Sequence, residues 1–269
     1  MEVSVVYMVA GLSSRFGGKI KQFAKVGPNG ESLIEYSLNQ ALKAGVGKVI
    51  FIVGGNTKAP FKEMFGTNYG GVPVFYAKQE IGENRDKPWG TTDALVSAKE
   101  VISGPYIICN GDDIYGESSF KILVDFLKHN SSSATVGYKL GGVIPKKGTT
   151  NRGIFEVENG KIKGIKEVFD IEKGKLGEKN LTEESLCSMN LFGLQRNSVD
   201  LLGQVLDEFK EQNKGDRKVE CLLPEELSNL IKEGKIGMSI FEAKDKWFGV
   251  TNPEDEVIVK KQLEKIHKG

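Results

Sequence analysis

Apolar runs alternate with amphipathic stretches along the first half of the chain. Residues 3–9 form a nearly continuous apolar run, as a strand covered on both faces of a sheet requires. Residues 32–44 place apolar side chains three and four positions apart, which predicts a helix that stops at Gly45. Further strands are predicted at 48–53, 72–77 and 105–109, with helices at 58–65 and 92–102. This alternation indicates βαβ units and an open, mostly parallel sheet.

The second half has a different pattern. Residues 153–158 and 161–168 flank Asn159-Gly160, a pair typical of the tight turn in a β-hairpin. The other predicted elements are strands at 186–194 and 237–243 and helices at 198–212, 225–233 and 254–267. No linker rich in proline or serine separates the halves, and no internal repeat is visible. We therefore expect one domain over residues 1–269.

Composition narrows the class of protein. The 269 residues are 39% hydrophobic and 27% charged, as in an ordinary folded protein and not a disordered chain. Lys plus Arg number 37 against 36 for Asp plus Glu, a net charge of +1. This balance argues against a general binder of polyanions, so no nucleic-acid partner is expected.

The numbers of cysteines and histidines and the lengths of the apolar runs exclude further classes of protein. Three cysteines that lie far apart do not form a disulfide framework, and two histidines cannot supply a three-histidine metal site. The apolar run at 3–9 lacks the features of a cleavable signal, and no run approaches the roughly 18 apolar residues of a membrane span. We expect a cytoplasmic protein with no membrane partner.

The loop at residues 10–23 carries the strongest chemical signal. It leaves the first predicted strand, is rich in small residues, and holds Arg15, Lys19 and Lys21 before the first helix. Small residues let backbone N–H groups converge on an anion, and the basic side chains add charge-assisted bonds to phosphate. The loop is not a P-loop, because no lysine followed by serine or threonine comes after a correctly spaced glycine. It is not a G-x-G-x-x-G turn either, because position 13 is serine. A flexible surface loop is the alternative interpretation.

Two other segments lie at predicted strand ends. Gln79 follows one strand, and Gly90-Thr91 opens the next helix, where a free N-terminus suits hydrogen bonding to a base or a ribose. The alternative is that Thr91 or Thr92 is a simple helix N-cap.

The strand at 105–109 is followed by Gly111-Asp112-Asp113, which places a carboxylate at the carboxyl end of the sheet. Mg²⁺ commonly uses one or two carboxylates together with phosphate oxygens. Adjacent acids usually point to different faces, so one of the two can bind the metal while the other caps the helix that starts near Glu117. Capping is the alternative role for Asp113.

The opening of the chain resembles the sugar-phosphate nucleotidyltransferase (NDP-sugar pyrophosphorylase) superfamily. The resemblance rests on Ala-Gly-x-x-Ser-Arg-Phe-Gly at 10–17, Lys-Gln-Phe at 21–23 and Ser-Leu-Ile-Glu-Tyr-Ser-Leu at 32–38. It implies an α/β, Rossmann-like fold: an open mixed, mostly parallel sheet with helices on both faces. It also implies a nucleoside triphosphate held by the loop backbone at Ala10, Gly11, Leu12 and Ser13.

In the same resemblance, Arg15 matches a residue that holds the triphosphate, and Lys21 one that stabilises charge on the α-phosphate. Gln79 and Gly90-Thr91 match the base-recognition segment, and Asp112 matches the aspartate that holds Mg²⁺. The chain departs from the family at Leu12 and Ser13, which are usually glycine, and at Ile20, which is usually proline.

The second half resembles the family more loosely. Three residues match positions that contact the sugar in the family: Gly153, Glu167 and Asn190. Val168 replaces the lysine that would bind the sugar phosphate. Gly249 replaces the aspartate that would be a second metal ligand, with Asp245 or Asp255 as substitutes. First-turn helix electrostatics is the simpler interpretation of Asp255.

These features predict a Mg²⁺-dependent nucleotidyltransferase that joins a nucleoside triphosphate to a phosphorylated small molecule, most simply a sugar 1-phosphate, and releases pyrophosphate. Residues 1–116 would bind the nucleotide and 117–269 the acceptor. The alternatives are a glycosyltransferase of similar fold and a nucleotide-binding regulator without catalysis. The sequence leaves open the base, the acceptor (phosphocholine included) and the oligomeric state.

Overall fold

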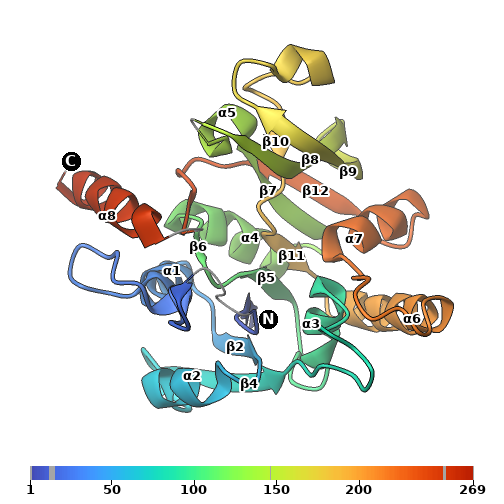
Figure 1. The fold of residues 1–269 in the computed structure, drawn as a ribbon, viewed down its shortest axis with the longest axis horizontal. Coiled ribbons are helices and arrows are strands. Elements are labelled where there is room, and N and C mark those ends of the chain that lie inside the picture. The colour runs from blue at the N-terminus through green and yellow to red at the C-terminus, as the bar shows by residue number, and fades with distance from the viewer. Residues whose placement is uncertain (1, 12–15, 146, 251–252, 269) are drawn as a thin grey trace.

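The computed structural model describes residues 2–11, 16–145, 147–250 and 253–268. Figure 1 shows strands and helices alternating through the first half of the chain and a long hairpin in the second. The strands are β1 (Ser4–Met8), β2 (Lys48–Val53), β3 (Asn68–Tyr69), β4 (Val72–Lys78), β5 (Tyr106–Asn110), β6 (Asp113–Ile114), β7 (Ser133–Lys139), β8 (Thr149–Glu158), β9 (Lys161–Glu172), β10 (Leu186–Cys187), β11 (Phe192–Leu194), β12 (Met238–Glu242) and β13 (Phe248–Gly249). The α-helices are α1 (Leu33–Lys43), α2 (Lys58–Phe65), α3 (Thr91–Ser97), α4 (Glu117–His129), α5 (Leu140–Val143), α6 (Asn197–Gln212), α7 (Leu223–Lys232) and α8 (Pro253–Lys268).

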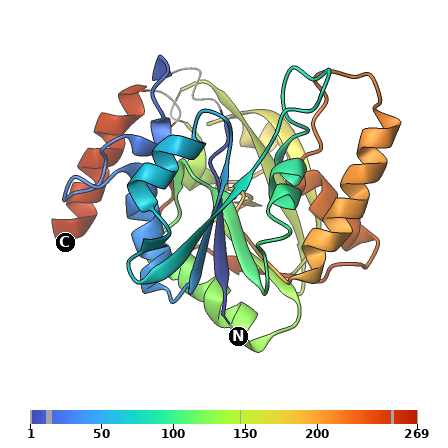
Figure 2. The ribbon, with the colours of Figure 1, turned by 90° about the horizontal axis from the view of Figure 1, so that it is seen from below.

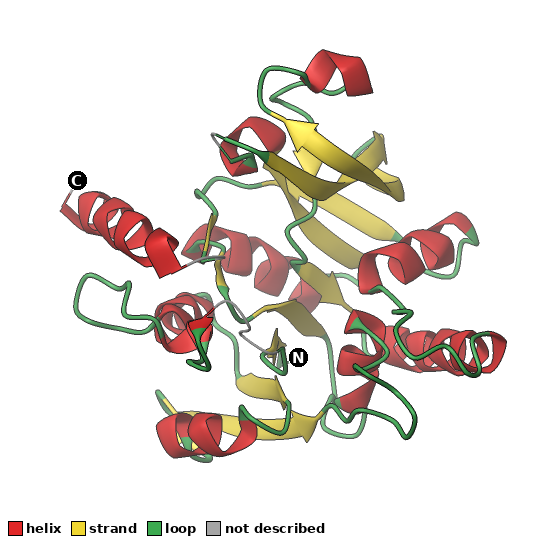
Figure 3. Ribbon diagram, in the orientation of Figure 1, coloured by secondary structure: helices red, strands yellow, loops and turns green. Residues whose placement is uncertain are grey.

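One sheet runs through both halves of the chain (Figure 3). Its strand order is β10-β8-β9-β12-β7-β11-β5-β1-β2-β4-β3. Strands β4, β2, β1 and β5 are parallel neighbours, and β12 is parallel to β7. The hairpin β8–β9 and the short strand β11 run antiparallel to their neighbours. This confirms the predicted α/β, Rossmann-like, open mixed sheet.

Helices cover both faces of the sheet, as Figure 2 shows from below. Strand β1 explains why, because its fully buried side chains alternate between two cores. Val5 and Tyr7 pack in the core that contains residues of α1, α2 and α4. Val6 packs in the other core, with residues of α3, α6 and α7. The continuous apolar run in the sequence thus reflects burial on two sides.

Helix α1 begins where the sequence predicts. Ser32 accepts a hydrogen bond from the Glu35 backbone N–H, and the Glu35 carboxylate accepts one from the Ser32 N–H, which together form a capping box. The bounds of β2 and α2 agree with the predicted 48–53 and 58–65. The hairpin also forms around Asn159-Gly160, although its strands are longer than predicted.

Beyond several short elements that the sequence did not predict, the structure differs from the prediction in three places. The strand predicted at 186–194 is two strands, β10 and β11, because Asn190 has a left-handed backbone (φ 59°) that interrupts the ladder. Helix α3 stops at Ser97, whose hydroxyl donates to the Ala94 carbonyl. The central strand β7 was not predicted, since its buried residues include the polar Ser133 and Thr135.

The last helix carries a third, smaller core. Val259 and Leu263 of α8 pack with Phe248 of β13 and Ile114 of β6, so the chain end is tied to the segment that follows β5. Among the described residues, no helix combines the length and apolar character needed to cross a bilayer.

Candidate functional site

Two cavities lie side by side at the carboxyl ends of the strands. The larger, which we call the strand-end cavity, has a volume of about 610 Å³ and is lined by the loops after β1, β2 and β4 and by the start of α3. The second, the hairpin cavity, has a volume of about 350 Å³ and lies between the hairpin β8–β9 and α7. Thr91 and Asn110 line both cavities, so ligands in the two would meet there.

The strand-end cavity brings together five of the predicted nucleotide-binding residues: Ala10, Gly11, Gln79, Gly90 and Thr91. This convergence follows from topology, because the carboxyl ends of neighbouring parallel strands meet at one edge of the sheet. Leu12, Ser13 and Arg15, which the sequence also predicts to contact the nucleotide, lie outside the described residues.

Gln79 is oriented by its own hydrogen bonds. Its side chain is buried, and its Nε2 donates to the Gly90 carbonyl at 2.9 Å and to Asp93 Oδ2 at 2.9 Å. Asp93 is held in turn by Lys210, whose Nζ lies 2.9 Å from Oδ1. Because both amide hydrogens are used, Gln79 has its oxygen left to accept a hydrogen bond from a ligand.

Gly90 occupies a position where a side chain does not fit. Its φ is +100°, and an added Cβ would lie 2.6 Å from the Cys221 carbonyl oxygen. The N-cap alternative for the threonines is wrong: Gly90 is the N-cap of α3, with no side-chain capping bond. The Thr91 hydroxyl instead accepts a hydrogen bond from the Leu223 backbone N–H at 2.8 Å.

Lys21 and Asp112 meet at the end of β5. Lys21 belongs to a 3₁₀ turn (Lys21–Phe23), and Asp112 follows the strand that ends at Asn110. Their side chains form an ion pair, and each retains 24% of its exposure. The predicted α-phosphate residue and the predicted metal ligand are therefore adjacent, and both remain accessible to a ligand.

Asp113 is buried next to this pair. Its Oδ2 accepts hydrogen bonds from Asn110 Nδ2 at 2.9 Å and from the Tyr115 hydroxyl at 3.1 Å. Burial and the neighbouring Asp112 carboxylate raise the pKa of Asp113 to about 7. The alternative that Asp113 caps α4 is wrong, because Gly116 is the N-cap and the Asp113 carboxylate points to Asn110 and Tyr115.

Asp245 takes the capping role at α4. Its Oδ2 accepts from the Ser118 backbone N–H at 2.8 Å, from the Ser118 hydroxyl at 2.5 Å and from the Ser119 N–H at 3.4 Å. This carboxylate oxygen is thus already engaged at a helix end, which weakens Asp245 as a substitute metal ligand.

Gly249 lies directly opposite Asp113 in the small β6–β13 ladder. A Cβ at this position would lie 2.5 Å from the ring of Trp247 and 2.9 Å from Asp113 Oδ1. Trp247 therefore occupies the space that a side chain at 249 would need. Among the described residues, no group of three His, Cys, Asp or Glu side chains could hold a metal ion.

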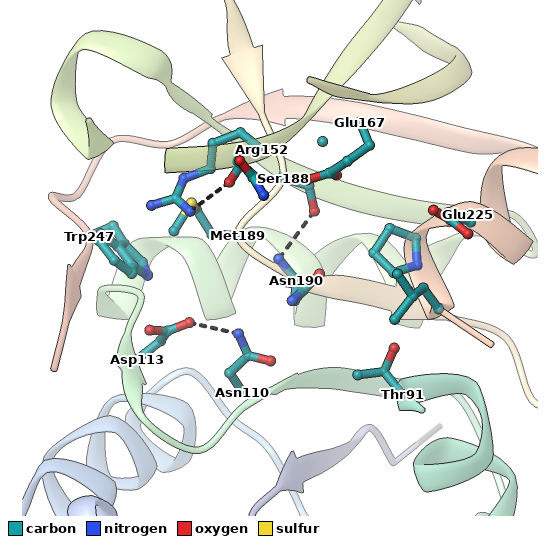
Figure 4. A pocket seen from close by; sticks show the side chains of 14 residues that line it. Thr91, Asn110, Asp113, Arg152, Glu167, Ser188, Met189, Asn190, Glu225 and Trp247 are labelled. Carbon is teal, nitrogen blue, oxygen red and sulfur yellow. Dashed lines mark hydrogen bonds between the residues drawn. The ribbon is translucent and has the colours of Figure 1, made fainter. Parts of the chain in front are cut away.

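The hairpin cavity brings together the three predicted acceptor residues, Gly153, Glu167 and Asn190 (Figure 4). Gly153 pairs with Glu167 across the hairpin, and a Cβ at 153 would lie 3.5 Å from the Glu167 carboxylate. The Asn190 backbone N–H donates to the Ser188 hydroxyl at 3.1 Å, which stabilises its left-handed turn.

The electrostatics of this cavity involve residues that the sequence analysis did not select. Glu225, at the start of α7, lines the same cavity as Glu167. Burial and the Glu225 carboxylate raise the pKa of Glu167, and Arg152 opposes this rise. Glu225 has no motif of its own, and Arg152 could have been found because it precedes the matched Gly153.

The sequence of this chain matches one known protein family. Residues 18–265 match the model of a family described as nucleotidyl transferase. No curated protein matches the sequence.

Many solved structures share the fold, among them the following three. A proposed glucose-1-phosphate thymidylyltransferase from Bacillus anthracis is 15% identical, with 97% of this chain and 95% of that chain covered and a TM-score of 0.70. The inositol-1-phosphate CTP transferase from T. maritima is 16% identical, with 100% and 97% covered and a TM-score of 0.71. A UDP-glucose pyrophosphorylase from Acinetobacter baumanii is 16% identical, with 100% and 98% covered and a TM-score of 0.66. At these identities the likeness concerns the fold alone.

Proposed function

The chain belongs to the nucleotidyl transferase family, and we propose that it joins a nucleoside triphosphate to a phosphorylated small molecule, most simply a sugar 1-phosphate, with release of pyrophosphate. Residues 1–116 would bind the nucleotide and residues 117–269 the acceptor, within a single domain. The structural neighbours named for inositol-1-phosphate and UDP-glucose chemistry agree with an acceptor that carries a phosphate and several hydroxyl groups.

The observation that carries this proposal is the shared wall of the two cavities. Thr91 and Asn110 line both, and Asp112, the ion-pair partner of Lys21, lies two residues after Asn110 in the chain. A nucleotide in the strand-end cavity and an acceptor in the hairpin cavity would therefore have their phosphates beside this pair. Holding two reactants in such an arrangement can remove several kcal/mol, up to about 11 kcal/mol, from the barrier of a two-substrate reaction.

The reaction is an in-line displacement at the α-phosphorus. An oxygen of the acceptor phosphate forms a new bond to that phosphorus, and the bond from the α-phosphorus to the bridging oxygen of the β-phosphate breaks. The electron pair leaves with pyrophosphate. No general base is needed, because the acceptor phosphate is already an anion at neutral pH.

Lys21 would stabilise the negative charge that develops on the α-phosphate oxygens. In the structure its ammonium is paired with Asp112, so a bound triphosphate must share or replace this partner. Arg15, which matches the family's triphosphate residue, would supply a second cation. The Gln79 oxygen would accept a hydrogen bond from the base, since its amide hydrogens are held by Gly90 and Asp93.

The residues beside Lys21 fit a Mg²⁺ ion. Asp112 is an accessible carboxylate, and Asp113 places a second one next to it. Mg²⁺ is usually held by one or two carboxylates plus substrate phosphates, so the lack of a closed ligand set in the described part of the chain agrees with it. When bound, Mg²⁺ supplies charge neutralisation on the phosphoryl oxygens.

The proposal is tested by a screen for pyrophosphate release. Each of the four nucleoside triphosphates and dTTP is incubated with Mg²⁺ and each member of a panel that includes glucose 1-phosphate, inositol 1-phosphate and phosphocholine. We expect one combination to release pyrophosphate and to yield a nucleotide-linked product by mass spectrometry. Triphosphate binding without pyrophosphate release from any combination would favour the regulatory alternative.

A further inference from the structure

The hairpin cavity has an uneven distribution of charge. Of the described residues that line it, Arg152 is the only one with a basic side chain, whereas Asp113, Glu167 and Glu225 are acidic. Figure 4 shows Trp247 and Asp113 toward one end, with Arg152 beside Trp247, and Glu225 at the other end. The cation therefore lies toward the end that contains Asp113.

The Arg152 guanidinium is held in place but keeps binding capacity. It donates to two backbone carbonyls, from Nη1 to Asn151 at 3.0 Å and from Nη2 to Val143 at 3.2 Å. Its centre lies 5.8 Å from the centroid of the Trp247 ring. Arg152 Nε is buried and has no hydrogen-bond partner in the described part of the chain, where Arg152 also forms no ion pair. A buried donor without a partner is costly. Nη1 and Nη2 each carry a second N–H beyond these carbonyl contacts, which an incoming acceptor group can use.

The register of the hairpin places Arg152 opposite a residue that the resemblance assigns to the acceptor phosphate. Arg152 pairs with Val168 across β8–β9, and residues directly opposite on an antiparallel ladder project from the same face. Val168 stands where the resemblance places a lysine for the acceptor phosphate. The chain thus retains a cation at this cross-strand pair, on the neighbouring strand.

Arg152 is also linked to the proposed reaction centre through packing. Its guanidinium lies over Trp247, Trp247 fills the space beside Gly249, and Gly249 is opposite Asp113. A phosphate bound to Arg152 would lie on the side of the cavity that faces Asp113. The rest of the acceptor would then extend toward Glu167 and Glu225.

Resting on the function proposed above, we propose that Arg152 binds the phosphate of the acceptor and so selects phosphate monoesters. Arginine binds phosphate well, because its planar fork can offer two parallel N–H donors. The carboxylates of Glu167 and Glu225 then require an organic part that donates hydrogen bonds, as the hydroxyls of a sugar or an inositol do.

The test compares kinetics of four proteins with the triphosphate and acceptor found by the pyrophosphate screen. Arg152→Gln should raise the acceptor KM at least 10-fold and change the triphosphate KM less than 2-fold. Arg152→Lys, which keeps the charge and the aliphatic stem, should raise the acceptor KM less. Adding Val168→Lys to Arg152→Gln should recover part of the lost affinity, since the lysine restores a cation at the same cross-strand pair.

A matched control removes an arginine elsewhere. Arg196→Gln breaks a partly exposed ion pair with Asp200 on α6, so both KM values should stay as in the unchanged protein. The proposal is overturned if Arg152→Gln leaves the acceptor KM unchanged or raises both KM values equally. It is also overturned if Arg152→Lys raises the acceptor KM as much as Arg152→Gln does. A positive charge at this position would then not be sufficient for the role, and the role of Arg152 would be structural.

A second measurement tests the role of Arg152 even if the proposed function is wrong. If the unchanged protein releases no pyrophosphate with any combination, the anion site is measured by titrating inorganic phosphate at constant ionic strength, followed by ³¹P NMR. Weaker phosphate binding in folded Arg152→Gln than in Arg196→Gln would support Arg152 as the phosphate ligand of a protein without this catalysis. Equal binding in the two variants would overturn the assignment.

Discussion

Lys21 and Asp112 form an ion pair at the carboxyl end of β5, although one follows the first strand and the other follows the fifth. The pair joins the two residues that the sequence assigns to the α-phosphate and to the metal ion. Each charge is thereby neutralised when no substrate is bound. Binding of a triphosphate with its cation would give each residue a new partner of opposite charge.

Lys21→Ala should lower kcat by at least 100-fold and weaken triphosphate binding by much less. Its charge matters most when negative charge grows on the α-phosphate, which is a property of the transition state. Single-turnover kinetics and calorimetric binding of the triphosphate measure the two effects. Lys25→Ala is the control, since Lys25 pairs with Glu35 at the surface and should leave both values unchanged. Equal losses in kcat and affinity would assign Lys21 to ground-state binding.

Asp113 should make the metal-free protein less stable as pH rises. Its pKa is raised from 3.8 to about 7, so the folded state binds the proton more tightly than the unfolded chain. Its contribution to stability is complete below pH about 4 and is lost as pH rises through about 7, with a slope of at most about 1.4 kcal/mol per pH unit.

Asp113→Asn should remove this pH dependence. Both hydrogen-bond donors to the carboxylate reach Oδ2, so an amide oxygen can accept them while the amide nitrogen takes the place of protonated Oδ1. Urea unfolding at several pH values between 4 and 8, with EDTA present, measures the difference from the unchanged protein. A constant difference across this range would show that Asp113 is ionised throughout.

Asp245→Ala should destabilise the fold by about 1 kcal/mol and retain turnover in the folded fraction. Its carboxylate caps α4 through Ser118 and Ser119, and losing a cap typically costs this amount. Asp245→Asn should restore most of the stability, because asparagine caps helices as well as aspartate does. Thermal unfolding and pyrophosphate release follow both properties. If the stable Asp245→Asn variant loses Mg²⁺-dependent turnover, Asp245 is a metal ligand and not only a helix cap.

Arg85→Ala should weaken binding in both cavities. Arg85 is buried, stacks on Trp89 at 3.6 Å, and donates to the carbonyls of Asp216 at 2.7 Å and Val219 at 2.6 Å. It therefore joins the loop that precedes α3, which lines the strand-end cavity, to the loop that precedes α7, which contributes Leu222 to the hairpin cavity and Glu220 to the strand-end cavity.

We expect a loss of about 3 kcal/mol in unfolding free energy for Arg85→Ala, as for buried hydrogen bonds to a charged group, and higher KM values for both substrates. Arg217→Ala is the control: Arg217 pairs with Asp86 between the same loops but is exposed, so stability should change little. If Arg85→Ala behaves like Arg217→Ala in denaturant titration and kinetics, Arg85 does not hold the loops together.

The strand-end cavity could be predicted because parallel strands bring their carboxyl ends together. Gln79 follows β4 and Asn110 ends β5, and knowledge of the sheet alone places both at the same edge. The orientation of Gln79 could not be predicted, because it depends on Asp93 and on Lys210 from a distant helix.

The hairpin cavity was less predictable, because residues from many segments far apart in the sequence meet there. The position of Glu225 depends on how α7 packs against β9, and that of Arg152 on the hairpin register. For Asp112 and Asp113, two adjacent acids look alike in the sequence. The pairing of β6 with β13 and the hydrogen bonds from Asn110 and Tyr115 determine which one is buried.

The central claim is that the nucleotidyl group, carrying the α-phosphate, passes to the acceptor. The most direct measurement follows the label from triphosphate labelled with ³²P at the α- or the γ-phosphate, incubated with Mg²⁺ and the acceptor found by the screen. We expect the α-label in the acceptor-linked product and the γ-label in pyrophosphate, in equal amounts, and neither transfer with Asp112→Asn. The γ-label in the acceptor or in free phosphate, or full transfer by Asp112→Asn, would contradict the account.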